Sequence, residues 1–230
     1  MYIKFQKIKK IAIIFLDRPQ KAHAYNQELL TQLQSEFREA SRCHSVLVLS
    51  STGNRHFCAG ADLNEMKQKT ANDALNMLSQ KVFDEIASSP TITIAALKGP
   101  AVAGGMELAL ACDLRVVSPN TYWKLPEVSL GLIPSAGGCT RLPELIGRSR
   151  ANAVILGGES IDAQSSLNWG IANRLHENPE EEAIRWALEI AEYDPLALRL
   201  AKQVLRNPSL ESERLAEAIL YEKQDKSAQK

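Results

Sequence analysis

Short apolar runs alternate with longer amphipathic stretches along the first half of the chain. The short runs are rich in β-branched residues and end at breaker or turn residues, which is typical of strands. They cover residues 11–16, 46–50, 91–97 and 114–117. Most of their positions are apolar on both alternating faces, so we expect a sheet that is covered on both sides.

Helical spacing fills the gaps between these runs. Asn26 is a candidate N-cap for a helix with an apolar stripe of Leu29, Leu30, Leu33 and Phe37. A second helix is expected to open at Asn72, with a stripe of Leu75, Leu78, Val82 and Ile86. The alternation of strands and helices predicts an α/β domain.

Beyond about Pro143 the strand signal fades and helical spacing predominates. The expected helices cover residues 148–156, 163–169, 179–192, 195–205 and 210–221. Pro179 fits the first position of a helix, and the three glutamates that follow it suit the positive end of the helix dipole. No Pro/Gly/Ser-rich or charged linker divides the chain, so residues 1–142 and 143–230 are expected to form one structural unit.

Composition narrows the class of protein. The 230 residues are 45% hydrophobic and 23% charged, which indicates a globular chain with a sizeable core. Its 27 Lys and Arg balance 27 Asp and Glu, so no global positive field favours a nucleic-acid partner. The basic, then apolar, start superficially resembles a signal peptide, but the apolar run is short and lacks a small-residue cleavage site. No apolar stretch reaches the ~20 residues that span a bilayer, so we expect a cytoplasmic protein without membrane association.

Cysteine and histidine usage gives no sign of a disulfide framework or a metal site. The four cysteines include no Cys-x-x-Cys pair, and a chain of this size can build a core without disulfides, so reduced thiols are expected. The four histidines lack the spacing that places two ligands on one helical face. We therefore expect no metal.

Two segments rich in small residues are candidates for binding a ligand oxygen. Residues 57–63 (Phe-Cys-Ala-Gly-Ala-Asp-Leu) follow one predicted strand, and residues 99–113 pass from another strand through a glycine-rich turn into a helix that begins near Gly104. Backbone N–H groups from two such loops can stabilise one oxyanion by about 3 kcal/mol per donor. The alternative for each loop is a tight packing turn that requires glycine for backbone geometry alone.

Two glutamates are candidates for acid–base chemistry. Glu107 lies in an apolar helical run without a cation three or four positions away, so burial would raise its pKa. Its alternative is a helix edge that reaches water. Glu127 follows Pro126 in a turn, where the alternative is a surface ion pair with Lys124.

Taken together, these segments resemble the crotonase (enoyl-CoA hydratase/isomerase) superfamily. The similarity runs in order through residues 16–26, 57–63, 99–113, 126–134 and 136–142. The resemblance implies an α/β fold built as a spiral of β-β-α turns, with the acyl-CoA site in residues 1–142. It also implies that the helices of residues 143–230 cap the site and form a homotrimer or a dimer of trimers.

The resemblance assigns roles to individual residues. The N–H groups of Ala61 and Gly104 would bind the thioester oxygen. Coenzyme A and the substrate would contact Ala22, Ala24, Ala59, Asp62, Leu63, Asn64 and Ser135. Coenzyme A enters as part of the substrate, and no separate cofactor is implied.

The glutamate pair favours hydration within the superfamily. Glu107 and Glu127 are 20 positions apart, as in hydratases of the family. Glu107 would deprotonate a water that attacks Cβ, and Glu127 would protonate Cα of a 2-enoyl-CoA. The alternatives are a Δ3,Δ2-enoyl-CoA isomerase or other acyl-CoA enolate chemistry, and an inactive scaffold of the same fold.

Two departures from the family pattern bear on the site. Ser135 replaces a glycine that hydratases usually carry near the bound water, which leaves less space there. The given sequence ends at Lys230, whereas members of the family generally continue into a further C-terminal helix that caps the site and contacts coenzyme A. Acyl-chain selectivity is expected to depend on side chains within residues 67–83 and 129–135.

Overall fold

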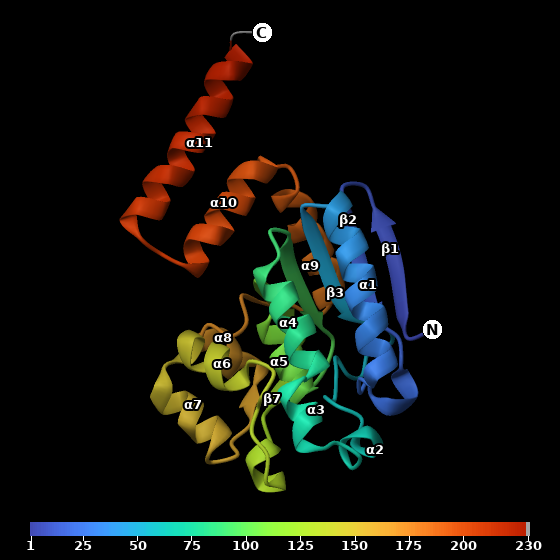
Figure 1. Cartoon of the computed structure of the whole chain (residues 1–230). Coiled ribbons are helices and arrows are strands. Elements are labelled where there is room, and N and C mark those ends of the chain that lie inside the picture. Colours follow the sequence, from blue (N-terminus) through green and yellow to red (C-terminus); the bar gives the residue numbers. More distant parts are fainter. Residues whose placement is uncertain (229–230) are drawn as a thin grey trace.

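A six-stranded sheet, mostly parallel, forms the centre of the computed structural model, which describes residues 1–228 (Figure 1). Its first pair of strands is antiparallel and all the other pairs are parallel. In spatial order the strands are β1 (Ile3–Ile8), β2 (Ile11–Leu16), β3 (Val46–Ser51), β4 (Ile92–Leu97), β6 (Leu114–Val117) and β9 (Arg174–Leu175). The four predicted strands are confirmed, with one end of β3 and of β4 shifted by one residue.

Both faces of the sheet are buried, as the apolar runs predict. Ile13, Val48 and Ile94 align across three neighbouring strands and are fully buried. They pack with α9 (Pro179–Ile190), whereas the alternate residues of the same strands join α1 (Gln27–Cys43) and α4 (Leu78–Ser88) on the other face. Each fully buried side chain of this size contributes about 1.5–3 kcal/mol, so these layers fix the sheet on which the site is built.

Very short strands were not predicted from the sequence. A second sheet consists of β5 (Ala101–Val102), β7 (Tyr122–Lys124) and β8 (Ile161–Asp162). Two or three residues carry no measurable periodicity, and tertiary pairing alone defines them. Strand β1 was missed because an exposed edge strand carries lysines that break its apolar pattern.

The helix expected to open at Asn72 is two helices. Thr70 caps the N-terminus of α3 (Ala71–Leu75) through a capping box with Asp73. The helical conformation is then interrupted at Met77, the residue before α4. Leu75 is 84% exposed and belongs to no apolar stripe of α4. The capping box starts α3 at Thr70 and the helix ends at Asn76, so apolar spacing alone gave a wrong prediction here.

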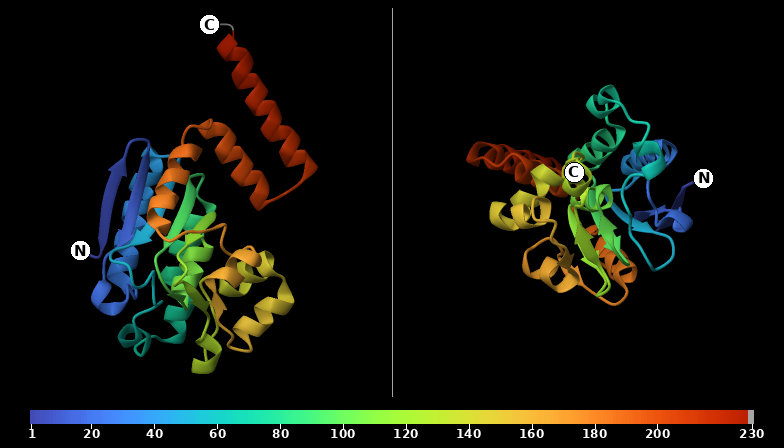
Figure 2. Two further views of the ribbon diagram at one scale, coloured as in Figure 1. Left: turned by 180° about the vertical axis from the view of Figure 1, so that it is seen from behind. Right: turned by 90° about the horizontal axis from the view of Figure 1, so that it is seen from below.

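The second half is helical, as predicted, apart from β8 and β9. Its remaining helices are α6 (Gly138–Ile146), α7 (Arg148–Ile155), α8 (Ala163–Asn168), α10 (Pro195–Arg206) and α11 (Leu210–Ala228). Lys202 anchors α10 to the sheet, because its buried ammonium group donates to Thr91 O at 2.8 Å and to Asp113 at 2.7 Å. Helix α11 packs against α10 and projects from the body of the molecule (Figure 2).

Candidate active site

Two loops rich in small residues lie against each other beyond the ends of β3 and β4. The N–H of Cys58 donates to Pro100 O at 3.3 Å, and the N–H of Val102 donates to Cys58 O at 3.0 Å. A side chain on Gly105 would place its Cβ 2.0 Å from Cys58 O, so only glycine permits this approach. The two segments singled out in the sequence therefore form one structure.

The backbone of the first loop orients the N–H of Ala61. Tyr25 donates to Gly60 O and accepts from the N–H of Asp62, both at 2.8 Å. In extended backbone the groups of the residue between these two bonds point the other way, so the N–H of Ala61 faces away from Tyr25. The loop thus leaves this donor available for another acceptor.

Gly104 begins helix α5 (Gly104–Leu110), and its N–H is one that helix geometry leaves without an intrahelical acceptor. A Cβ built on Gly60 would lie 3.1 Å from this nitrogen, so the first loop runs directly beside it. Ala103 enters the helix at φ 52°, a strained conformation for a residue with a side chain. The predicted donors from the two loops are consequently close neighbours.

Tyr25 is a neighbour of this pair that sequence reasoning missed. A Cβ on Gly104 would lie 1.9 Å from the Tyr25 hydroxyl oxygen. The ring is buried and packs edge-on against Phe83 with centroids 5.7 Å apart. Burial raises the Tyr25 pKa, so the hydroxyl stays neutral. It lies within residues 16–26, one of the segments that carry the family resemblance, and this position was its signal in the sequence.

Glu107 points into the protein from α5. Its side chain is buried, and Oε1 accepts from the N–H of Ala136 at 2.7 Å and of Gly138 at 2.9 Å. Burial raises the pKa of Glu107, while the two N–H donors and the nearby charge of Arg141 oppose that rise. The helix-edge alternative is therefore wrong, and the donors hold this carboxylate in a fixed orientation.

Glu127 begins a 3₁₀ turn, η2 (Glu127–Leu130), and is also buried. Its Oε2 has no hydrogen-bond partner among the described residues. Burial and the adjacent charge of Glu107 raise the Glu127 pKa to about 7. Glu127 therefore lies inside the protein rather than in the surface ion pair with Lys124 that was the alternative.

Two of the residues expected near coenzyme A, Ala24 and Asp62, bind the side chain of Arg18. Ala59 donates to Ala22 O at 3.0 Å, which joins the first loop to the turn after β2. Arg18 donates to Ala24 O at 2.8 Å and pairs with Asp62 at 2.7 Å. Sequence reasoning quoted Arg18 only as part of a motif, because its partners are identifiable only in three dimensions.

Asp62 has a structural use in addition to its expected contact. Its carboxylate accepts from the N–H of Asn64 at 2.9 Å and so caps α2 (Leu63–Met66). Leu63 is 64% exposed at the start of that helix. Asp62, Leu63 and Asn64 thus form a single turn at the surface end of the loop.

Ser135 lies where the site meets α4. Its hydroxyl contacts the sulfur of Met77 at 3.4 Å, and its carbonyl accepts from Gln80 at 2.8 Å. The next residue, Ala136, donates to Glu107. Ser135 therefore contacts the segment expected to influence acyl selectivity and directly precedes a residue that binds Glu107.

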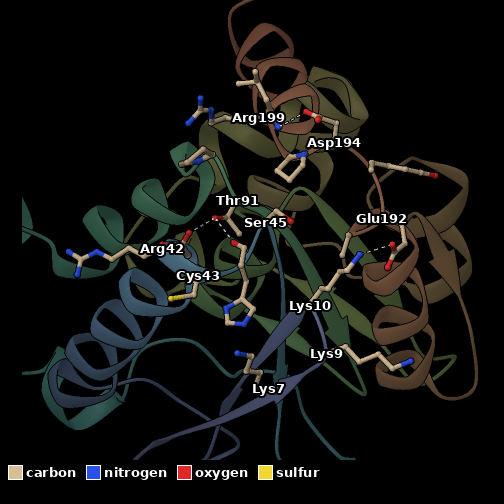
Figure 3. A pocket seen from close by; sticks show the side chains of 17 residues that line it. Lys7, Lys9, Lys10, Arg42, Cys43, Ser45, Thr91, Glu192, Asp194 and Arg199 are labelled. Carbon is tan, nitrogen blue, oxygen red and sulfur yellow. Dashed lines mark hydrogen bonds and ion pairs between the residues drawn. The ribbon is translucent and has the colours of Figure 1, made fainter. Parts of the chain in front are cut away.

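Two open cavities differ in their relation to these residues. One of about 570 Å³ lies beside Ala22 and is lined also by Thr52, Arg55 and His56. Another of about 830 Å³ lies at the opposite end of the sheet, where β3 and β4 begin (Figure 3). It is lined by basic side chains, including Lys7, Lys9 and Lys10, and holds none of the predicted site residues.

Two structural features are absent from residues 1–228. No helix in this span has the length and apolar content to cross a membrane. The same residues contain no group of three or more His, Cys, Asp and Glu placed to hold a metal ion.

Comparison with known proteins places this site in a family. The model of the enoyl-CoA hydratase/isomerase family matches residues 6–229. The 2,3-dehydroadipyl-CoA hydratase of Escherichia coli K12 is 39% identical over 203 residues, covering 86% of this chain and 79% of that protein. The short-chain-enoyl-CoA hydratase of Clostridium acetobutylicum is 33% identical over 206 residues, covering 87% of this chain and 79% of that protein.

The fold gives the same result. A crystal structure of enoyl-CoA hydratase from Bacillus anthracis superposes with a TM-score of 0.90 at 32% identity, covering 96% of this chain and 90% of that one. The fold is thus an α/β crotonase fold with C-terminal helices. The chain belongs to the enoyl-CoA hydratase/isomerase family, the crotonase superfamily, as the sequence motifs indicated.

Proposed function

We propose that the protein hydrates 2-enoyl-CoA thioesters to 3-hydroxyacyl-CoA. The observation that carries this proposal is the pair of buried glutamates in unlike environments. Glu107 receives two backbone N–H bonds, which favour its ionised form, whereas Glu127 has an unpartnered oxygen and a pKa raised to about 7. A base and an acid of this kind are what addition of water requires.

The neighbouring N–H groups of Ala61 and Gly104 would bind the thioester carbonyl oxygen. When water attacks Cβ, electron density moves from the double bond onto that oxygen and forms an enolate. Fixed donors at the point where charge grows stabilise this transition state more than the ground state. The close approach of the two loops at Gly60 supports this assignment.

The proton steps use one glutamate each. Glu107 takes a proton from water as the new C–O bond forms at Cβ, and Glu127 gives its proton to Cα as the enolate collapses. The step leaves Glu107 protonated and Glu127 ionised, and a proton must pass from the first to the second before the next turnover. The product thus gains the elements of one water molecule, a hydrogen at Cα and a hydroxyl group at Cβ. Because Glu127 is half protonated near pH 7, it can donate without a large barrier.

Isomerisation of a 3-enoyl-CoA is the alternative within the family. It needs one carboxylate to carry a proton between two carbons, and no attacking water. The buried, unpartnered oxygen of Glu127 beside a second carboxylate supports hydration, because a shuttle mechanism gives the second glutamate no task.

The remaining expectations are also proposals. The residues expected to contact coenzyme A or the substrate are Ala22, Ala24, Ala59, Asp62, Leu63, Asn64 and Ser135. Arg18 joins the two segments that contain the first six, because it binds Ala24 and Asp62. We expect a homotrimer or dimer of trimers, which would cover apolar side chains exposed at the end of η2 and just beyond it: Leu130, Leu132 and Ile133. Sedimentation should then give three or six times the chain mass of 25.4 kDa.

Hydration is tested by adding the protein to crotonyl-CoA and following loss of the conjugated enoyl-thioester absorbance. Glu107→Gln and Glu127→Gln should each lower kcat by at least about 100-fold. Glu144→Gln, a change at an exposed carboxylate of α6, is the matched control. A wild type that binds acetoacetyl-CoA, converts 3-enoyl-CoA and leaves crotonyl-CoA unchanged would overturn hydration in favour of isomerisation. No binding at all would favour the scaffold.

A further inference from the structure

In residues 135–138, Ala136 and Gly138 present their N–H groups inward, and Ser135 and Ala136 present their carbonyls outward. The inward N–H groups of Ala136 and Gly138 bind Glu107. On the outer side, Gln80 Nε2 donates to Ser135 O at 2.8 Å and Arg141 Nη1 donates to Ala136 O at 3.0 Å. The two successive carbonyls of this loop are therefore each held by a side chain from a helix.

One peptide unit connects Gln80 directly to Glu107. Ser135 O and the N–H of Ala136 belong to the same amide group, which accepts from Gln80 on one side and donates to Glu107 at 2.7 Å on the other. A hydrogen bond to the oxygen of an amide polarises it and strengthens the bond that its N–H donates. Gln80 thus acts on Glu107 without touching it.

Arg141 is itself fixed in place. Its Nη2 donates to Asp84 Oδ1 at 3.2 Å, and Asp84 lies one helical turn from Gln80 on the same side of α4. The guanidinium also packs over Gly137, where a Cβ would lie 1.8 Å from Nη1 and φ is 115°. The positive φ favours glycine at this position, and the absence of a side chain leaves room for the guanidinium.

On the basis of the proposed function, we propose that Gln80 and Arg141 are positioning residues that clamp residues 135–138 and thereby place Glu107 for proton transfer. Helix α4, which the sequence associates with acyl selectivity, supplies Gln80 and the anchor of Arg141. The clamp acts on Glu107 in two ways: its hydrogen bonds fix the position of the carboxylate, and the positive charge of Arg141 acts on it electrostatically.

Four ionisable groups surround Glu107: Glu127 on η2, Tyr25 before α1, and Cys139 and Arg141 on α6. Of these only Arg141 carries positive charge, and it lowers the Glu107 pKa. Removing Arg141 or the Gln80 amide weakens stabilisation of the ionised carboxylate, so the Glu107 pKa should rise. A base must be ionised to act, and the acidic limb of the pH–rate profile should therefore move to higher pH.

The test compares Gln80→Met and Arg141→Met with Lys81→Met and Arg148→Met. The controls lose a positive charge at exposed sites outside the clamp, one on α4 and one on α7. With crotonyl-CoA we expect Gln80→Met to lower kcat about fivefold, as one hydrogen bond of roughly 1 kcal/mol implies, with KM changed less than twofold. The acidic limb should move to higher pH in both clamp variants. Arg141→Lys should show a smaller shift than Arg141→Met, because it keeps the positive charge.

Two results would overturn the clamp. The first is a Gln80→Met profile that coincides with that of Lys81→Met. The second is a fall in kcat of equal size at every pH, which would indicate a merely structural role. Gln80 is exposed, so this variant should fold even if Arg141→Met does not.

A silent wild type would instead count against hydration, and the clamp would still be testable. The Glu107 carboxyl can be titrated by infrared difference spectroscopy, with Glu107→Gln used to assign its band. An unchanged Glu107 pKa in both clamp variants would overturn the proposal independently of any activity.

Discussion

Arg18 and Asp62 form an ion pair of 2.7 Å that joins the turn after β2 to the first turn of α2. Their side chains are only 12% and 10% exposed. Arg18 also donates to Ala24 O, and Asp62 also accepts from the N–H of Asn64 and so caps α2. The pair therefore connects two segments that we expect to contact coenzyme A.

Arg18→Met should therefore weaken both folding and ligand binding. It leaves Asp62 largely buried without its partner, which costs about 2 kcal/mol of unfolding free energy, less than a fully buried pair because some solvent remains. Calorimetry with acetoacetyl-CoA should show weaker binding, and chemical denaturation should show the loss of stability. The control is Arg38→Met, which breaks the more exposed pair with Glu85 and should cost less unfolding free energy. Equal losses in the two variants would contradict the special role of Arg18.

Glu127→Gln should stabilise the protein at alkaline pH. Folding raises the Glu127 pKa from 4.5 to about 7, so the folded state binds more protons than the unfolded state between these values. Stability then declines as pH rises through that window and stays reduced above it. The Tm of the variant relative to wild type should accordingly be higher at pH 8 than at pH 4.5. A Tm difference that is independent of pH would show that Glu127 ionises normally.

The pH dependence of kcat/KM should be bell-shaped. Glu107 must be ionised, which gives the acidic limb, and Glu127 must be protonated, which gives a basic limb near about pH 7. Because the two carboxylates interact, both limbs belong to the pair. Steady-state rates with crotonyl-CoA from pH 5 to 9 check this. A rate that stays constant above pH 8 would exclude Glu127 as the proton donor.

Gly104→Ala should abolish activity by displacing Tyr25 or the helix start. The added Cβ would lie 1.9 Å from the Tyr25 hydroxyl oxygen and would disturb the N–H that we assign to the thioester oxygen. Gly158→Ala is the control, since φ is 73° there but no atom lies within 4 Å. That change should cost about 1 kcal/mol of stability and leave kcat unaltered. Wild-type turnover in Gly104→Ala would remove Gly104 from the oxyanion site.

Local signals made much of the fold predictable. Strands β2, β3, β4 and β6 are continuous apolar runs, and Asn26 caps α1 as its residue type suggests, accepting from the N–H of Leu29 at 3.0 Å. The neighbouring loops at Gly60 and Gly104 could be anticipated because consecutive parallel strands end at the same edge of a sheet.

Long-range partners could not be predicted in the same way. The donors of Glu107 lie 29 and 31 residues away, and no periodicity links them to it. Nor does a proline-containing turn reveal that Glu127 is buried. The break between α3 and α4 lies at Asn76 and Met77, inside a stretch whose apolar spacing is that of one helix. These features become definite only when separate segments pack.

The strands of the central sheet follow one another across it in the order of their synthesis, from β1 to β9. A chain emerging from the ribosome can therefore add each strand to an edge that already exists, without inserting one between two others. Until β9 (Arg174–Leu175) forms, β6 remains an open edge able to pair with another nascent chain. Formation of this two-residue strand ends the interval in which β6 is unpaired on that side, and chains halted before it should precipitate more readily than longer ones.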